Sequence, residues 1–530
     1  MRNVLIDLPA SFPAGYILAL EKVFPVRFTT DASVRPLHAT IRVVGSPHAI
    51  LSQDCPVLSF PHWQEGNEVA QGDIEFSNDS RTPGTLRGHT LHEQEALLTD
   101  TESFEHVLAT CNGAPVWGIL GSNHYRVLCP APAWNDDTTW NETLHGTRAL
   151  FAIAVFHFIR DVVLQYELPD TIHVDFIVDD PDLTSLSYGF FAYRKMLAFA
   201  RQECIHWTIA TVPLGLRWSK ARAARFFEEN KEHFSLCIHG NNHTLRELVV
   251  RDGYPPHYAE RTAAQALQRV RTFEAKRGNV LDRVVVPPHE RYSSSLAAGY
   301  ARQGCRGLST AIIQPDNQED RAFAPEQSPD RQVWGLLPAD SSSGLPILER
   351  MYNRWSQNRI LINIFLGKPL IVMFHHHYFE KNLEKLRDQI RWIHTLGNVK
   401  WQSMQTTLCT MYRLRHTSPD EVEVEPFSTS CSASIDPEIQ HVTIRLPLLH
   451  YYQGTPRVFA NDSELTLARD DQGRFFARYT RQNTSDVTIR VEYYPEPVPA
   501  YEPLPLTPFV LYRRLAVLAR DKLLFRLVHK

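Results

Sequence analysis

Residues 172–180 read IHVDFIVDD, an apolar run that ends in two adjacent carboxylates, Asp179 and Asp180. Further apolar runs of strand length follow as far as residue 402, and amphipathic helical patterns separate them. Strands that alternate with helices predict a parallel sheet. Seven or eight such units in about 245 residues predict a closed β/α barrel, whose chemistry lies at the carboxyl ends of its strands. The expected strands are 172–178, 207–212, 234–238, 283–286, 307–312, 333–337, 370–374 and 399–402, and the expected helices are 189–203, 219–230, 257–277, 294–303, 345–360, 380–396 and 403–415.

The segments on either side of the predicted barrel have other patterns. Short apolar runs between turns predict an N-terminal β-rich or α/β accessory domain over residues 1–140. A mostly apolar stretch at 143–168 predicts a buried helix that leads into the barrel, which we place at 141–416. Alternating strands predict a small antiparallel β-sandwich at 417–495, which either packs on the barrel or contacts a polymer. Residues 496–530 predict a Pro-rich linker and a basic amphipathic helix, which either lies on an anionic membrane or docks on the protein.

The composition is that of a soluble globular protein. Apolar residues make up 43% of the 530, and the net charge of −4 excludes a strong basic excess, so we expect no nucleic-acid partner. The longest apolar stretch, Ala149–Ile159, is shorter than the roughly 20 residues that span a bilayer. The eight cysteines contain no CxxC pair, which favours free thiols in a reducing compartment. With an N-terminus unlike a signal peptide, these features predict a cytoplasmic protein.

The paired carboxylates Asp179 and Asp180 close the first strand of the predicted barrel. Two acids brought into one pocket repel each other unless a cation is present. A metal would bind one of them as a ligand and leave the other as a base. The alternative is an ordinary solvated helix start, because Asp before Pro is a common N-terminal signal.

Histidines follow two further strands. His239 and His243 stand four residues apart around a Gly-Asn-Asn turn, and neutral imidazoles at this spacing suit zinc and other late divalent metals. His375, His376 and His377 follow the strand 370–374 directly, and one of them could protonate a leaving amine. Alternation predicts that the first and third point the same way. The alternative is one structural and two solvent-exposed histidines.

The strand 283–286 leads into a rigid exit formed by two prolines. Pro288, His289 and Glu290 could line the rim of a pocket there, or the prolines could simply shape the loop. All of these polar residues fall at carboxyl ends of strands in one predicted barrel. Two histidines and one carboxylate form a zinc site that leaves room for a water molecule.

The motifs resemble those of the polysaccharide deacetylase superfamily, also called carbohydrate esterase family 4. The doubled aspartate of Val178-Asp179-Asp180-Pro181 and the pair His239/His243 match two of its motifs over roughly residues 170–416. The resemblance implies a distorted barrel of about seven β/α units. It implies Asp179 as the base, with Asp180, His239 and His243 as metal ligands. His375 would be the catalytic acid, and His376 and His377 are alternatives.

The chain departs from the family pattern in its third motif. Val286 stands where the family has an arginine that orients the base, so Arg283 or Arg291 would have to replace it. The aspartate-tryptophan motif of the family is not recognisable, although Trp334 and Asp340 lie in a plausible region.

The sequence therefore leads to three functional hypotheses. The first is a deacetylase that depends on a divalent metal, with zinc favoured, and that acts on an N-acetylated amino sugar in a glycan or glycolipid, in the cytoplasm or at the inner membrane face. The second keeps the fold but changes the substrate to a non-sugar amide or an O-acyl ester. The third is a non-catalytic glycan-binding or scaffolding protein. Its functional parts would be the β-sandwich and the C-terminal helix, which could make a peripheral contact with a membrane.

Overall fold

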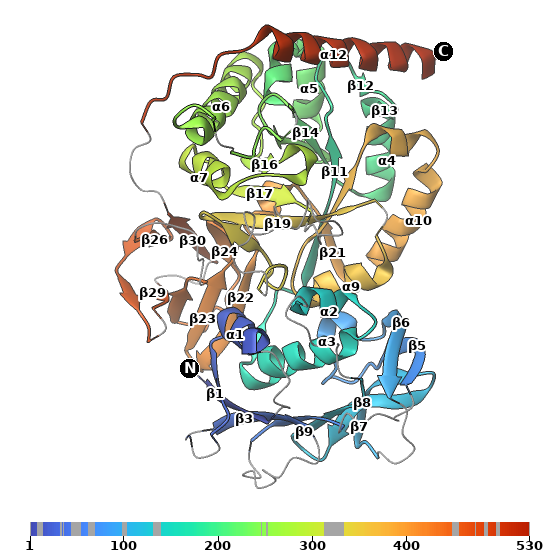
Figure 1. Cartoon of the computed structure of the whole chain (residues 1–530), viewed down its shortest axis with the longest axis vertical. Helices are drawn as coiled ribbons and strands as arrows, with labels where there is room; N and C mark the ends of the chain where they lie inside the picture. Colours follow the sequence, from blue (N-terminus) through green and yellow to red (C-terminus); the bar gives the residue numbers. More distant parts are fainter. Residues whose placement is uncertain are drawn as a thin grey trace.

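The computed structural model describes residues 2–7, 14–31, 34, 37–43, 55–61, 69–97, 103–130, 139–244, 246–250, 253–311, 333–353, 355–447, 455–471, 473–481, 486–493 and 499–528. In Figure 1 the N-terminal sheet lies at one end of the molecule and the β/α barrel lies above it. The β-sandwich flanks the barrel, and the C-terminal helix crosses the far end.

Seven parallel strands close the barrel, which confirms the predicted (β/α)7 fold. They are β11 (Thr171–Asp179), β14 (Trp207–Thr211), β15 (Phe234–His239), β16 (Val284–Val286), β17 (Gly307–Thr310), β19 (Leu345–Tyr352) and β20 (Leu370–Phe374). Closure occurs at β11, which pairs in parallel with both β14 and β20. The first half of β11 also pairs with β21 (Asn398–Trp401), and β18 (Asp340–Ser342) pairs antiparallel with β19.

Helices cover the outside of the barrel because one face of each is apolar. They are α4 (Tyr193–Glu203), α5 (Ala221–Glu229), α6 (Tyr258–Arg277), α7 (Ser294–Arg302), α9 (Gln357–Phe365), α10 (Leu383–His394) and α11 (Met404–Leu408). Inside the barrel, the buried side chains of Ile177, Ala210, Cys237, Leu348 and Ile371 belong to one hydrophobic cluster, as in the packed interior of other β/α barrels.

The predicted order of elements is wrong at one barrel strand. Residues 333–337, expected as a strand, form turns, and the strand is β19, which was expected as the start of a helix at 345–360. Only Gln357–Phe365 is helical. Glu349 and Arg350 interrupt the apolar run of β19, and such a pattern favours an amphipathic helix when the partners are unknown. Both side chains are buried in ion pairs, so the strand tolerates them.

Two other predicted helices are shorter than expected. The stretch 143–168 divides into α2 (Trp140–His145), α3 (Ala149–His157) and a π-helical turn η2 (Phe158–Val163), followed by the short strand β10 (Tyr166–Glu167). Gly146 ends α2, because glycine readily leaves the helical conformation. The expected helix 403–415 ends at Leu408, and the chain continues as β22 (Tyr412–Ser418).

The N-terminal region is an α/β unit with one mixed sheet. Its strands, in spatial order, are β2 (Val26–Thr29), β1 (Arg2–Asp7), β3 (Leu37–Val43), β4 (Val57–Phe60), β9 (His124–Val127), β8 (Ala114–Leu120), β7 (His106–Cys111), β5 (Val69–Phe76) and β6 (Thr90–Leu97). The pairs from β2 to β9 are parallel, and those from β9 to β6 are antiparallel. Helices α1 (Ala14–Val23) and α3 pack their apolar side chains against this sheet.

Two further sheets pack face to face as the expected sandwich. One contains β10, β22, β23 (Glu421–Pro426), β25 (His441–Arg445), β29 (Phe475–Thr480) and β28 (Leu467–Arg469). The other contains β24 (Ser430–Ala433), β30 (Val487–Glu492), β26 (Arg457–Ala460) and β27 (Ser463–Leu465). The sandwich is not purely antiparallel as predicted, because β23 and β25 pair in parallel.

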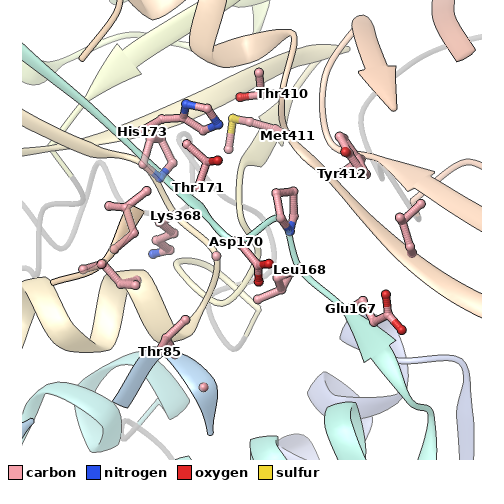
Figure 2. Close-up of a pocket in the computed structure, with 18 of the residues that line it drawn as sticks. Thr85, Glu167, Leu168, Asp170, Thr171, His173, Lys368, Thr410, Met411 and Tyr412 are labelled. Carbon is pink, nitrogen blue, oxygen red and sulfur yellow. The ribbon is translucent and has the colours of Figure 1, made fainter. Parts of the chain in front are cut away.

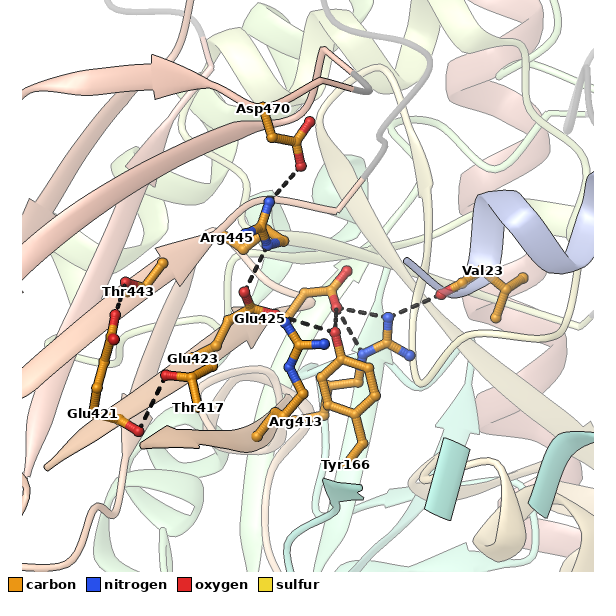
Figure 3. Close-up of polar contacts among 11 residues, drawn as sticks. Val23, Tyr166, Arg413, Thr417, Glu421, Glu423, Glu425, Thr443, Arg445 and Asp470 are labelled. Atoms are coloured by element: carbon orange, nitrogen blue, oxygen red, sulfur yellow. Dashed lines mark hydrogen bonds and ion pairs between the residues drawn. The ribbon is translucent and has the colours of Figure 1, made fainter. Parts of the chain in front are cut away.

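A buried polar network joins the N-terminal unit, the strand before the barrel and the sandwich (Figure 3). The guanidinium of Arg413 donates from Nε to Glu425 Oε2 at 2.7 Å and from Nη2 to the carbonyl of Val23 at 2.9 Å. Its carbon Cζ lies 4.2 Å from the ring centre of Tyr166, whose hydroxyl donates to Glu423 at 3.2 Å. One arginine thus connects segments from three parts of the chain.

The C-terminal helix α12 (Pro508–Val528) lies across the end of the barrel towards which its strands run (Figure 1). The expected linker starts at residues that lie outside those described, and its remainder follows α6, where Gln265 donates to the carbonyl of Leu504 at 2.7 Å. Among the described residues, no helix is both long and apolar enough to span a bilayer. All eight cysteines are free, as predicted; five are buried, but Cys204 is exposed.

Candidate metal centre

Three predicted ligands lie together at the carboxyl end of the barrel. Asp180 follows β11, His239 ends β15, and His243 follows it after a turn. Asp180 Oδ1 lies 2.8 Å from His243 Nε2 and 3.4 Å from His239 Nε2. The potential ligand atoms of all three residues lie within 4.8 Å of one another. Two imidazoles and one carboxylate at this separation can hold a divalent cation.

Local geometry directs these ligand atoms towards one point. Asp180 adopts a left-handed conformation with φ 77°, which turns the chain out of β11 and separates its side chain from that of Asp179. His239 Nδ1 lies 3.0 Å from the carbonyl oxygen of Val286 and donates to it, so Nε2 is left with a lone pair that faces Asp180. Asp180 Oδ1 is buried and accepts no hydrogen bond of ordinary geometry, which fits a cation in its place.

The turn between the two histidines is held by a buried carboxylate. Glu247 accepts hydrogen bonds from the backbone N–H groups of Asn241, Asn242 and His243 at 2.8–3.1 Å. Gly240 has φ 59°, and a Cβ there would come within 2.4 Å of Glu247 Oε1, so the turn requires glycine. The turn that presents His243 is therefore rigid.

Asp179 lies beside the ligand cluster, and its side chain belongs to a buried charge network. Arg350 Nη1 donates to Asp179 Oδ1 at 2.8 Å, and the same guanidinium pairs with Glu290. Burial raises the pKa of Asp179, but the charges of Arg350, His239 and His375 outweigh it and hold the pKa below its usual value. Asp179 is thus a carboxylate at neutral pH, fixed in position next to the ligand cluster.

The guanidinium at Asp179 comes from Arg350 in β19 and not from Arg283, one of the two arginines expected there. Arg283 lies outside the barrel and pairs with Glu274 at 2.7 Å. Sequence reasoning missed Arg350 because β19 was expected to be helical. An arginine in the middle of an apolar run, with no carboxylate at a helical spacing to pair with, is the signal that could have indicated it.

The expected rim residues occupy the loop after β16. Pro288 packs against the turn at Gly240, and the ring of His289 lies 5.3 Å from that of His243. Burial and the neighbouring imidazoles lower the pKa of His289. Glu290 is not at the rim: it is 4% exposed and accepts hydrogen bonds from Arg350 and from the N–H of Ala311 at 2.7 Å.

The three consecutive histidines separate after β20. His375 and His377 are exposed, whereas His376 is buried, which is the exposure pattern of the alternative with one structural and two solvent-exposed histidines. The ring of His376 packs edge-on against Tyr188, 5.0 Å between ring centres, and burial lowers its pKa to about 4. A Cβ at Gly189 would come within 2.3 Å of His376 Nδ1, so this contact is close. Of the three, His375 is the one whose charge lowers the pKa of Asp179.

A cavity of about 760 Å³ lies at the opposite end of the barrel, where β11 and β20 begin (Figure 2). Asp170, Thr171, His173 and Lys368 line it, together with Tyr412 at the edge of the sandwich. Lys368 is already paired with Glu349 at 2.5 Å. Catalytic groups of β/α barrels lie at the other end, so this cavity is not our candidate active site.

Comparison with known proteins gives likenesses only among solved structures. No family model and no curated protein matches the sequence. A candidate polysaccharide deacetylase from Mycobacterium smegmatis is similar at 11% identity and TM-score 0.31, over 46% of this chain and 91% of its own. A family 4 carbohydrate esterase from Streptomyces lividans, in complex with acetate, is similar at 12% identity and TM-score 0.26, over 45% of this chain and 94% of its own.

A third similar structure is described as a pseudoenzyme. It is a family 4 protein from Bacillus anthracis, with 11% identity and TM-score 0.26, over 44% of this chain and 64% of its own. Each of these similarities covers less than half of this chain.

Proposed function

We propose that the chain is a metal-dependent deacetylase that hydrolyses the acetamide of an N-acetylated amino sugar. The observation that carries the proposal is the cluster of Asp180, His239 and His243 beside a separately buried carboxylate, Asp179. The cluster would hold the metal, and Asp179 would remain available as a base. Such a division would give a hydrolytic site both a metal ligand and a general base.

The donor set favours zinc among the divalent metals. Two imidazole nitrogens and one carboxylate oxygen are typical of catalytic zinc, which keeps its fourth position for water or substrate. When bound, such a metal acidifies a water molecule and polarises the acyl carbonyl. The hydrogen bond from His239 to Val286 and the support of the turn by Glu247 would orient two of the ligands.

The side chains around the cluster can move the protons of the reaction. Asp179 would accept a proton from the attacking water, whose oxygen forms a bond to the acetyl carbon. Arg350 would keep Asp179 ionised and oriented for this step. As the carbon–nitrogen bond breaks, His375 would donate a proton to the amine nitrogen, and acetate and the free amine result.

Acetate release tests this proposal directly. Purified zinc-loaded protein is incubated with N-acetylglucosamine oligomers and, in parallel, with O-acetylated xylan. We expect acetate from the N-acetylated substrate and a loss of about 10⁴-fold or more in the Asp179→Asn variant, which keeps the shape but not the base. His416→Ala, in an exposed position of the sandwich, is the control and should retain activity.

The alternative functions give different results in the same assay. Release from the O-acetylated substrate alone would favour an esterase with the same site. A zinc-loaded protein that binds oligosaccharide but releases no acetate from any acylated substrate would contradict the deacetylase proposal and favour a glycan-binding role. Activity that survives in Asp179→Asn would contradict the assignment of the base.

A further inference from the structure

Helix α12 has one face docked on the barrel. Arg513 Nη1 donates to the backbone carbonyl of His243, and Arg514 is 5% exposed and packs on the turn that contains Gly215. A Cβ on Gly215 would lie 2.8 Å from Arg514 Nη2. Leu518, one turn further along, is also 5% exposed. The inner face of α12 is therefore fixed beside the candidate metal centre.

The opposite face of α12 presents large apolar side chains to the solvent. Phe509 and Tyr512 are 73% and 70% exposed, and Leu515 and Leu523 are 40% and 60% exposed. Among the described residues, nine large apolar side chains are strongly exposed, and these four share one helix. Phe509, Tyr512 and Leu523 recur with the small residues Ala516 and Ala519 every three or four positions, so these five form a stripe along the helix, and Leu515 lies beside it. A stripe of this kind marks an interaction surface.

The charge of the helix indicates which partner fits this stripe. The sequence of α12 contains five arginines and lysines and one acidic residue, Asp521. Arg520 is exposed on the helix, and Arg217 is exposed on the turn beneath it. A second copy of the same helix would bring like charges together, which opposes pairing along the stripe. An anionic surface attracts the same charges.

We propose that the outer face of α12 is a membrane-binding surface that inserts Phe509, Tyr512 and Leu523 among anionic phospholipids. A basic helix with an aromatic and aliphatic stripe lies in the plane of the bilayer interface and buries that stripe at the level of the headgroups. Such a contact would hold the carboxyl end of the barrel next to the membrane, because the inner face of α12 is bound there. The contact does not depend on the activity proposed above.

Vesicle sedimentation tests the proposal with the full-length protein. The parent is mixed with sucrose-loaded vesicles of phosphatidylcholine, with or without phosphatidylglycerol. We expect the parent to sediment with the anionic vesicles. The partition coefficient of the Phe509→Glu, Tyr512→Glu double variant onto the same vesicles should be at least about tenfold lower. Val280→Glu is the matched control, since Val280 is 75% exposed at the other end of the barrel, and it should bind like the parent.

Three outcomes would overturn the membrane proposal. They are a parent that stays in solution with anionic vesicles, a double variant that binds as the parent does, and a parent dimer in light scattering that the double variant converts to monomers. The last result would show that a second copy covers the stripe. Unchanged thermal midpoints of the variants establish that they fold. Asp180→Ala should bind vesicles like the parent, which separates this proposal from the proposed catalysis.

Discussion

Arg350 and Asp179 form an ion pair in the interior of the barrel, with Nη1 and Oδ1 2.8 Å apart and both side chains at most 3% exposed. The pair links β19 to the end of β11 and, through Glu290, to the loop after β16. It fixes the carboxylate that we propose as the base. It also keeps that carboxylate ionised, since burial alone would favour the neutral acid.

Replacing Arg350 by methionine should therefore change the pH dependence of acetate release. Without the guanidinium, the pKa of Asp179 rises, and the base is ionised only at higher pH. We expect the acid limb of kcat/KM to move to higher pH and the plateau to fall about 100-fold. Arg283→Met, which removes an arginine paired outside the barrel, should leave the acid limb in place. A parent-like acid limb in Arg350→Met would contradict this role.

Glu247 should control metal affinity without touching the metal. Glu247→Gln weakens the acceptor of three backbone N–H groups in the turn that presents His243. We expect zinc binding to weaken about 10–100-fold, as with other supports of metal ligands. Competition with a chromophoric chelator measures this. Glu260→Gln, on the exterior of α6, should bind zinc like the parent, and equal affinities in the two variants would remove Glu247 from this role.

Glu349 should stabilise the fold in a manner that depends on pH. Burial opposes its ionisation, but Lys368 and Arg359 lower its pKa to about 2. The unfolded chain binds the proton at a higher pH, so the ionised pair contributes its full stability above about pH 4.5 and loses it as the pH falls towards 2. At pH 7 we expect the free energy of unfolding of Glu349→Gln to be about 3 kcal/mol lower than that of the parent.

Urea unfolding at pH 7, 4.5 and 3.5 checks this prediction. The difference in the free energy of unfolding between Glu349→Gln and the parent should become smaller from pH 4.5 to pH 3.5, because the parent then loses the same interaction. Glu464→Gln removes an exposed carboxylate that is paired with Arg457. This control should have nearly the same free energy of unfolding as the parent at all three pH values. If the difference in the free energy of unfolding instead became larger at acidic pH, the predicted direction of the pH dependence would be wrong.

Arg413 should couple the N-terminal unit to the β-sandwich. Arg413→Met leaves the buried Glu425 without its cation and the carbonyl of Val23 without its donor. Breaking a buried pair in this way costs about 3–5 kcal/mol. We expect a lower thermal midpoint in calorimetry. In limited proteolysis we expect faster cleavage between the N-terminal unit and the β-sandwich. Arg457→Met, in an exposed pair, is the control, and equal midpoints of the two variants would argue against this coupling.

The sequence predicted the barrel and the cluster because both depend on local signals. Apolar runs that end in Asp179, His239 and His375 show where strands stop, and parallel strands bring their carboxyl ends to one side of a barrel. The prediction of a helix at 345–360, which depended on distant partners, failed. The strand β19 looks helical until Glu349 and Arg350 are paired with residues from other elements.

Other features of the site depend on contacts between segments that are distant in the sequence, so the sequence alone did not predict them. Nothing near Val286 in the sequence indicates that its carbonyl accepts a hydrogen bond from His239. By contrast, Thr244 and Glu247 have the T-x-x-E spacing of a capping box, so the support of the turn by Glu247 had a local signal that was missed. The position of α12 next to His243 depends on packing over 270 residues of separation and has no such signal.

Metal content tests the central claim most directly. The parent, Asp180→Ala, His239→Ala and the control His416→Ala are supplied with zinc, freed of excess metal and measured by elemental mass spectrometry. The account predicts about one zinc ion per chain in the parent and the control, with loss in both cluster variants. A parent without bound metal, or cluster variants that keep it, would contradict the proposal that Asp180, His239 and His243 form a metal centre.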